Sequence, residues 1–130
     1  MPKVTQLVLN LESKAGVLAH VCGVLGAAGV NILGLAAGEA SAGKGKLRLV
    51  VADPAKAEAA LKDAKLRCGR EEAISLSLAD RPGAMAEAAQ KLARAKVNIK
   101  CAYATSTGGG QATVVLTVSN VDKGLAALSQ

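Results

Sequence analysis

Hydrophobic and polar positions along this chain follow two different periods. Residues 3–11 alternate in part and are rich in β-forming side chains, which predicts a strand. A polar turn at 13–16 follows, and apolar residues then recur at helical spacing until Gly29, a residue typical of helix ends. One face of this predicted helix carries Leu18, Cys22 and Leu25, with Val17, Val21 and Val24 on its shoulder.

The rest of the first half reads as a hairpin and a second helix. Strands are predicted at 30–37 and 46–52, joined by a glycine-containing loop at 41–45. Asp53 and Pro54 predict the start of a helix to about Lys65, because Asp caps helices and Pro suits the first position. Residues 66–70 are predicted as a short fourth strand.

The second half predicts the same elements again. A strand at 72–78 leads to a turn at 80–83 and a helix to about Lys96. Strands at 97–107 and 111–118 flank a triple-glycine hairpin, and Asn120 is placed to cap a last helix. No strand is predicted after that helix.

An offset of 67 positions superimposes the two halves without a gap. It brings Gly16 onto Gly83 and Asn31 onto Asn98. An unbroken register predicts two copies of one small unit, with domains at 1–70 and 71–130. The element order predicts an α+β fold of two ferredoxin-like (βαββαβ) sandwiches in tandem, the second copy lacking its last strand.

Composition and charge narrow the possible functions. The chain has 130 residues, 51% of them hydrophobic, and Tyr103 is the only aromatic residue, so the core is expected to consist of Val, Leu, Ile and Ala. The net charge is +6, and the basic groups at 44–48 and 62–70 are interpreted as solvated faces. RNA-recognition motifs with this element order stack bases on aromatic side chains, which the predicted central strands lack, so no nucleic-acid partner is expected.

The cysteines and the uncharged stretch of the first half indicate the cellular setting. Cys22, Cys68 and Cys101 are widely spaced and accompany a single histidine, so we expect reduced thiols in a cytoplasmic protein without bound metal. The start of the chain does not resemble a signal peptide. Residues 15–38 carry no charge, but six glycines interrupt them and their duplicate is charged, so no membrane span is expected. No catalytic motif and no cofactor motif is apparent.

The turn before each first helix has the chemistry to bind a zwitterion. A helix N-terminus offers free backbone N–H groups to a carboxylate, and Gly16 or Gly83 would leave the backbone open to a ligand. Asp80 could accept an ammonium group, and Asn31 or Asn98 could donate and accept hydrogen bonds. Structural roles explain these residues equally well: Gly16 and Gly83 would satisfy the turn geometry, and Ser13 and Asp80 would cap the helices. Asn31 and Asn98 would hydrogen-bond the turn between helix and strand.

The two turn–helix–strand stretches resemble the ACT domain, an amino-acid-binding family. The second half carries Asp80-Arg81-Pro82-Gly83 and Val97-Asn98-Ile99, and the first half carries the corresponding residues 13–16 and 30–32, with Ala15 in place of proline. The resemblance is strongest to stand-alone tandem ACT proteins of bacteria, and it implies effector binding at interfaces between two ACT units. The implied ligand-binding residues are Ser13, Ala15, Gly16, Val17, Asn31, Asp80, Pro82, Gly83, Ala84 and Asn98.

Two functions follow from the resemblance. One is a free-standing, non-catalytic sensor of an amino acid, and the other is a regulatory subunit that docks on a biosynthetic enzyme such as acetohydroxyacid synthase. The helix of the first half is apolar nearly all round, with small residues at Gly23 and Gly26. Such a helix is expected to be buried on more than one side, which predicts a homodimer or a tight contact with a partner enzyme.

Overall fold

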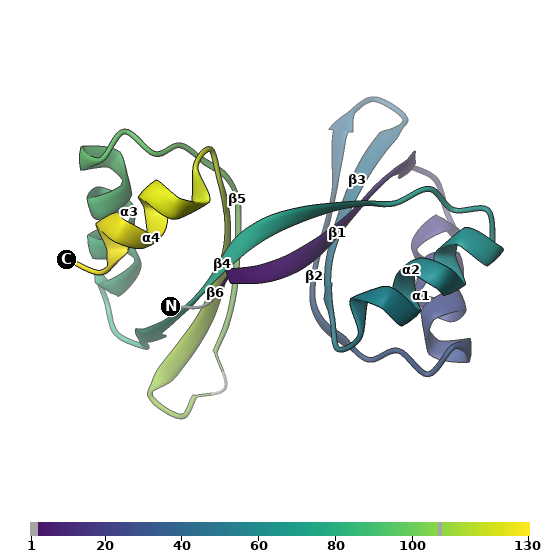
Figure 1. Cartoon of the computed structure of the whole chain (residues 1–130), viewed down its shortest axis with the longest axis horizontal. Helices are drawn as coiled ribbons and strands as arrows, with labels where there is room; N and C mark the ends of the chain where they lie inside the picture. Colours follow the sequence, from purple (N-terminus) through teal and green to yellow (C-terminus); the bar gives the residue numbers. More distant parts are fainter. Residues whose placement is uncertain (1–2, 107) are drawn as a thin grey trace. The chain divides into compact units, whose positions relative to one another are not determined.

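Residues 3–106 and 108–130 are described by a computed structural model, shown in Figure 1. Thr107, which was predicted to end a strand, and the first two residues of the predicted first domain lie outside the described residues. The elements follow the predicted order except at the junction of the halves. The order is β1 (Lys3–Glu12), α1 (Val17–Ala27), β2 (Ile32–Ser41), β3 (Lys44–Val51), α2 (Pro54–Asp63), β4 (Gly69–Ala79), α3 (Ala84–Arg94), β5 (Ile99–Ser106), β6 (Gln111–Val118) and α4 (Val121–Leu128).

The junction between the halves is one continuous strand. Two strands were predicted there, at 66–70 and 72–78, but a single strand, β4, begins at Gly69 and runs without interruption to Ala79, so it includes only the last two residues of the first predicted strand. The prediction of two strands was wrong because the charged Glu71 looks like a polar break in the sequence. Glu71 instead sits within the strand, where its Oε1 accepts hydrogen bonds from Gln6 Nε2 at 2.8 Å and Arg48 Nε at 3.0 Å.

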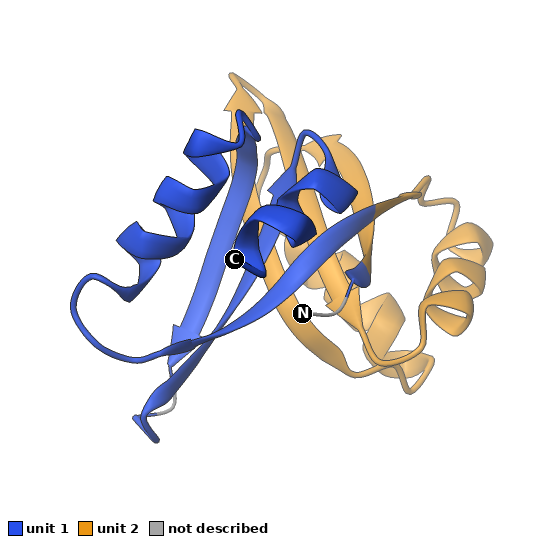
Figure 2. Cartoon of the chain, turned by 60° about the vertical axis from the view of Figure 1, so that its left-hand side comes forward, with its two compact units in different colours: residues 1–4, 72–130 blue, residues 5–71 orange. Residues whose placement is uncertain are grey.

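The chain forms two compact units, coloured separately in Figure 2. Unit 2 is the continuous stretch Thr5–Glu71, which is the first repeat. Unit 1 contains Lys3–Val4 and the described residues from Glu72 to Gln130, which are the second repeat. Two strands change unit along their length: β1 starts in unit 1 and continues in unit 2, and β4 starts in unit 2 and continues in unit 1. No strand follows α4 in the described part of the chain.

Both units keep the same strand pairing. In unit 2 the order is β2-β3-β1, and in unit 1 it is β5-β6-β4, all antiparallel. Leu7 pairs with Leu49 in unit 2, and Ile74 pairs with Leu116 in unit 1, a shift of 67 in both partners. Even the irregularity near the start of β2 recurs at the start of β5. The sequence offset therefore holds at the level of hydrogen-bonded register.

Each unit has its own core between the sheet and its two helices. Strand side chains at alternate positions meet the helices, as period-2 patterning requires. In unit 2 the fully buried side chains include Leu9 and Leu49 of the strands, Leu25 of α1 and Leu61 of α2. The equivalent core of unit 1 centres on Ile74, Leu92 and Leu116. As expected, aliphatic residues build both cores.

The side of α1 that faces the core includes only part of the apolar face predicted from the sequence. Leu25 of that face and Val21 of its shoulder are the buried residues of α1, whereas Leu18 is 43% exposed. The sequence does not show which side faces the core, because α1 is apolar on most sides and has no single hydrophobic stripe. The matching helix α3 has polar residues on its outer side and buries Ala88 and Leu92, the equivalents of Val21 and Leu25.

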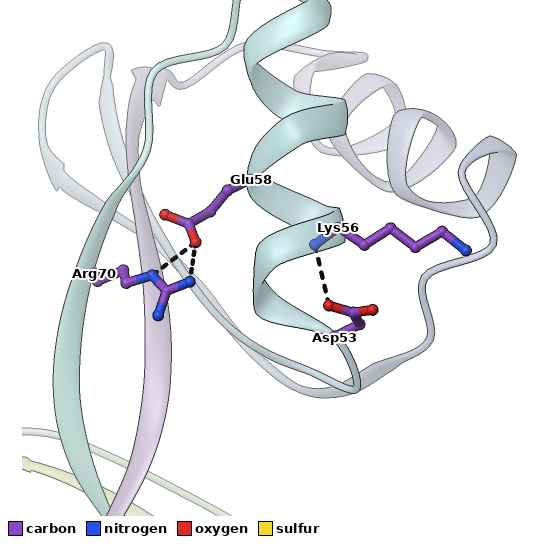
Figure 3. Close-up of polar contacts among 4 residues, drawn as sticks. All are labelled: Asp53, Lys56, Glu58 and Arg70. Atoms are coloured by element: carbon purple, nitrogen blue, oxygen red, sulfur yellow. Dashed lines mark hydrogen bonds and ion pairs between the residues drawn. The ribbon is translucent and has the colours of Figure 1, made fainter.

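Side-chain contacts hold the second helix of each unit, first of all at its start. The carboxylate of Asp53 accepts a hydrogen bond from the backbone N–H of Lys56 at 3.1 Å, as Figure 3 shows, and Asn120 caps α4 in the same way at 3.0 Å. These contacts confirm the two predicted caps. Arg70 of β4 donates from Nε and Nη2 to Oε1 of Glu58 on α2 (Figure 3). The hydrogen bonds from Arg70 lower the pKa of Glu58, so the pair remains charged at neutral pH and joins α2 to the strand.

Candidate functional site

The turn after the first strand of each unit is built around a left-handed glycine. Gly16 has φ 90° and Gly83 has φ 86°, values that only glycine adopts without strain. These glycines occupy the N-cap positions of α1 and α3, and neither helix receives a side-chain cap. The interpretation of Ser13 and Asp80 as helix caps is therefore wrong. Their side chains are used elsewhere.

Ser13 and Asp80 join the turn to two other segments of their own unit. The backbone N–H of Ser13 donates to the carbonyl of Gly43 at 3.0 Å, and that of Asp80 donates to the carbonyl of Gly110 at 2.9 Å. Ser13 Oγ donates to Glu39 Oε2 at 2.6 Å, near the end of β2. In unit 1 the equivalent bond runs the other way, because Ser106 Oγ donates to the carboxylate of Asp80.

The serine and the acid have thus changed places between the repeats. Position 39 is equivalent to position 106 under the offset of 67, as 13 is to 80. One hydroxyl–carboxylate hydrogen bond joins the turn to the strand end in both units. The carboxylate comes from the strand in unit 2 and from the turn in unit 1. This exchange leaves the bond intact but moves the negative charge.

A cavity of about 220 Å³ lies beside this turn in unit 2. It lies between the end of β1, the start of α1 and the adjoining ends of β2 and β3. This volume is below the roughly 300 Å³ at which pockets for drug-sized ligands begin, so it suits a smaller molecule. Its lining consists of Leu11, Glu12, Ser13, Lys14, Val17, Leu18, Ala37, Gly38, Glu39, Gly45, Lys46 and Leu47.

The cavity combines both signs of charge with an apolar wall. Lys14 and Glu12 form an ion pair at 3.1 Å whose side chains are mostly exposed, so it is worth little in stability. Glu39 is hydrogen-bonded only to a neutral hydroxyl among the contacts of the described residues, and Lys46 lies on the same wall without an ion pair among those residues. Carboxylates, ammonium groups and aliphatic side chains are therefore within reach of one small ligand.

The predicted site residues of unit 2 do not all lie together in the structure. Ser13 and Val17 line the cavity, whereas Ala15 and Gly16 lie in the adjoining turn outside the lining set. Asn31 follows the far end of α1, about 16 Å along an 11-residue helix from its start. Its backbone carbonyl accepts from Ala52, as the carbonyl of Asn98 accepts from Ser119. Within one unit the structure therefore does not bring the asparagines to the turn.

The other predicted residues form the equivalent turn in unit 1. Asp80, Pro82 and Gly83 lead into α3, which begins at Ala84. Arg81 crosses this region, with Nη1 donating to the carbonyl of Pro82 at 3.2 Å and Nη2 bonded to Glu87 at 2.9 Å. The start of α3 is thus held by an arginine, whereas the equivalent Lys14 bonds backward to Glu12.

Sequence reasoning missed Glu39, Lys46 and the apolar wall. Glu39 was placed in no motif because its partner Ser13 lies 26 residues away in the sequence. The exchange with Ser106 could have revealed it, because a serine–acid pair that swaps positions between repeats indicates a contact.

Comparison with models of protein families identifies the family of this chain. A family model described as an ACT domain pair matches residues 2–128. The chain belongs to this family. The match spans both repeats, and it therefore includes both glycine turns and the cavity of unit 2.

Solved structures with similar folds include one close in sequence and several distant ones. A protein from Bacteroides thetaiotaomicron is 34% identical, with a TM-score of 0.89 over 98% of this chain and 87% of that chain. The ligand-free regulatory subunit of aspartate kinase from Thermus thermophilus is 18% identical, with a TM-score of 0.69 over 97% of this chain and 90% of that one. An allosteric aspartate kinase from Clostridium acetobutylicum is 13% identical, with a TM-score of 0.61 over 95% of this chain and 32% of that one.

The two distant similarities show a shared fold. A comparison with curated proteins gives no match. Among the described residues, no helix has both the length and the apolar character needed to cross a membrane. In the same part of the chain, no three His, Cys, Asp or Glu side chains are grouped so that they could hold a metal ion.

Proposed function

We propose that this ACT domain pair is a non-catalytic regulatory protein of the cytoplasm that binds a free amino acid in the cavity of unit 2. One observation carries the proposal. A single small cavity contains a carboxylate, ammonium groups and aliphatic side chains. An amino acid needs an acceptor for its ammonium group, donors for its carboxylate and an apolar surface for its side chain.

Each part of the ligand has a proposed partner. The carboxylate of Glu39 accepts the ammonium group, a charged donor that replaces the neutral hydroxyl of Ser13. Lys14 and Lys46, with the uncapped first turn of α1, attract the ligand carboxylate. The ligand side chain lies against Val17 and Leu47.

The turn of unit 1 is proposed as a second, different site. Asp80, Pro82, Gly83 and Ala84 provide it with a carboxylate on the turn, but Arg81 already bonds across the start of α3. Asn31 and Asn98 would reach a ligand only from another ACT unit.

A thermal-shift screen of the twenty amino acids tests the proposal. A ligand that binds only the native state at 100 times its Kd stabilises the protein by about 2.7 kcal/mol. Glu39→Gln should weaken the response to the active amino acid by about 10- to 100-fold, since a hydrogen bond to a charged group is worth about 1.5–3 kcal/mol. Detection needs an external dye because the chain has no tryptophan.

The equivalent change in unit 1 provides the control. Asp80→Asn removes the carboxylate of the other hydroxyl–carboxylate pair and should leave the response of the unit 2 cavity intact. Loss of the response in Asp80→Asn alone would assign the ligand to unit 1. If no amino acid shifts the melting temperature of the wild type, the proposed function is wrong.

The alternative function is a regulatory subunit of an amino-acid biosynthetic enzyme, such as acetohydroxyacid synthase. The fold shared with the regulatory subunit of aspartate kinase favours it. In this case the purified protein should change the kinetics of the partner enzyme in response to the amino acid. The cavity in unit 2 would have the same ligand under both functions.

A further inference from the structure

A groove in unit 1 concentrates positive charge between its two helices. Its volume is about 420 Å³, and it lies between α3 and α4. Lys91 and Arg94 of α3 and Lys123 of α4 supply its charges, while alanines make up most of the remaining lining. Lys91 and Arg94 are neighbours on one helix face at a spacing of three residues, where like charges oppose each other.

The acidic side chains of unit 1 do not neutralise this groove. Glu72 and Asp122 both pair with Lys3, at 3.5 Å and 2.8 Å. Glu87 pairs with Arg81 at 2.9 Å, and the carboxylate of Asp80 accepts from Ser106. These four residues are all the Asp and Glu of unit 1. Within the described residues, the groove's cations have no ion-pair partner.

The duplicated fold does not require Lys91 and Arg94. Their equivalents in unit 2 are Val24 and Ala27, on a helix of the same length with no basic residue in its last turn. Helix-end stabilisation alone therefore does not account for the pair.

Lys123 differs from the other two cations because its equivalent, Lys56, is also a lysine. Lys56 Nζ lies 3.5 Å from the point that a Cβ on Gly29 would occupy, just past the end of α1, and Figure 3 shows its extended side chain. This position suits a shared structural role at the helix end. Lys91 and Arg94 are thus the charges specific to the second repeat.

We propose that this groove is a docking site for an acidic segment of a partner protein. Because the groove is positively charged, charge complementarity requires an occupant with negative charge. Arginine and lysine on a helix flank match spaced carboxylates, and the alanine floor leaves room for a backbone to approach. The lining contributes no hydroxyl group, and the backbone N–H of Lys123 in the first turn of α4 already donates to the side chain of Asn120, so the groups that hold a compact phosphate are not available. The proposal does not depend on amino-acid binding in unit 2.

Fluorescence anisotropy with a labelled twelve-residue peptide of alternating Glu and Ala tests the proposal on the full chain. The variant K91A/R94A should weaken peptide binding about 10-fold or more at 0.15 M salt. The matched control K62A/R67A also removes one lysine and one arginine, both exposed in unit 2, and should bind as the wild type does. Thermal unfolding of both variants verifies that they are folded.

Three outcomes would overturn the proposal. Equal losses in the two variants would mean that only net charge matters. Failure of the peptide to bind the wild type at 100 micromolar would show that the groove is not a docking site for acidic segments. Tighter binding of pyrophosphate or of a twelve-nucleotide single strand, lost in K91A/R94A, would assign the groove to phosphate ligands instead.

Discussion

At the scale of single residues, the exchange of serine and acid between the repeats separates the hydrogen bond from the position of the negative charge. The hydroxyl–carboxylate bond between turn and strand end occurs in both units, with the serine and the acid exchanged. The location of the charge differs, and this difference can distinguish the two turns toward a ligand. The bond and the charge can therefore be varied independently.

Converting unit 2 to the pattern of unit 1 should preserve stability and change ligand binding. Ser13→Ala should lower the free energy of unfolding by about 0.5–1.5 kcal/mol, the net value of one hydrogen bond. The double variant S13D/E39S should recover most of this loss, because Asp at position 13 can again accept from a serine. Urea denaturation measures both changes.

The same double variant should no longer respond to the amino acid as the wild type does. A double variant as unstable as Ser13→Ala would show that the bond depends on local geometry that the two units do not share. A response to the amino acid identical to that of the wild type would show that the position of the carboxylate does not matter.

At the scale of the elements, α1 and α3 are equivalent helices with different outer faces. α3 carries charges on its outer side, whereas the outer side of α1 includes Gly23 and Gly26, both exposed. A Cβ built on either glycine meets no atom within 4 Å. Unit 2 itself therefore gives no packing reason for these glycines.

Gly23→Ala and Gly26→Ala should each stabilise the isolated chain. Alanine is favoured over glycine inside a helix by about 0.8–1 kcal/mol, and there is space for the methyl group. Urea denaturation at low protein concentration measures the gain. Gly124→Ala is the control, because its Cβ would lie 3.1 Å from Ile74 Cδ1 and the close contact should offset the helix gain.

A loss of stability in Gly23→Ala or Gly26→Ala would mean that another chain already covers this face. The methyl groups would then disturb a contact that the isolated unit does not contain. This result would support the prediction that α1 is buried on a second side.

The sequence predicted the repeat, two helix caps and the element order outside the junction of the halves, because these depend on local spacing and on residues such as Asp53 and Asn120. It did not predict which side of α1 faces the core. Leu18 and Leu25 are the same residue type, and only packing distinguishes the exposed one from the buried one. Glu39 was missed because its partner Ser13 is 26 residues away, and no local pattern connects them.

At the scale of the whole molecule, unit 2 exposes large apolar side chains that unit 1 mostly lacks. Leu33 is 61% exposed, Leu18 43% and Leu35 37%. Leu33 and Leu35 lie on β2, the outer strand of the unit 2 sheet, where backbone groups are free to pair with another chain. The equivalents of these two residues in unit 1 are Lys100 and Ala102. We therefore propose that the chain forms a homodimer through this part of unit 2.

Leu33→Lys should weaken the homodimer while preserving the fold. It gives β2 the residue that β5 carries naturally, and it affects a side chain outside the buried core. Val24 is a poorer site for such a change, because it packs partly against the core. Light scattering at low micromolar concentration should show a dimer for the wild type and a shift toward monomer for the variant.

Lys100→Leu in unit 1 serves as the matched control and should leave the dimer unchanged. A monomeric wild type would contradict the proposal directly. Equal dimerisation of the wild type and Leu33→Lys would place the interface elsewhere.

Lys3 belongs to unit 1 although it precedes unit 2 in the sequence, and this affects how the chain folds during synthesis. Lys3 pairs with Glu72 and with Asp122 near the start of α4, and its hydrogen bond to Asp122 raises its pKa. Unit 2 is one continuous stretch and can form once residue 71 has left the ribosome. Unit 1 includes both Lys3 and α4, so its last contacts form only after α4 has left the ribosome. A ribosome stalled before α4 should therefore display a protected first repeat while Lys3 and Val4 are still open to proteases.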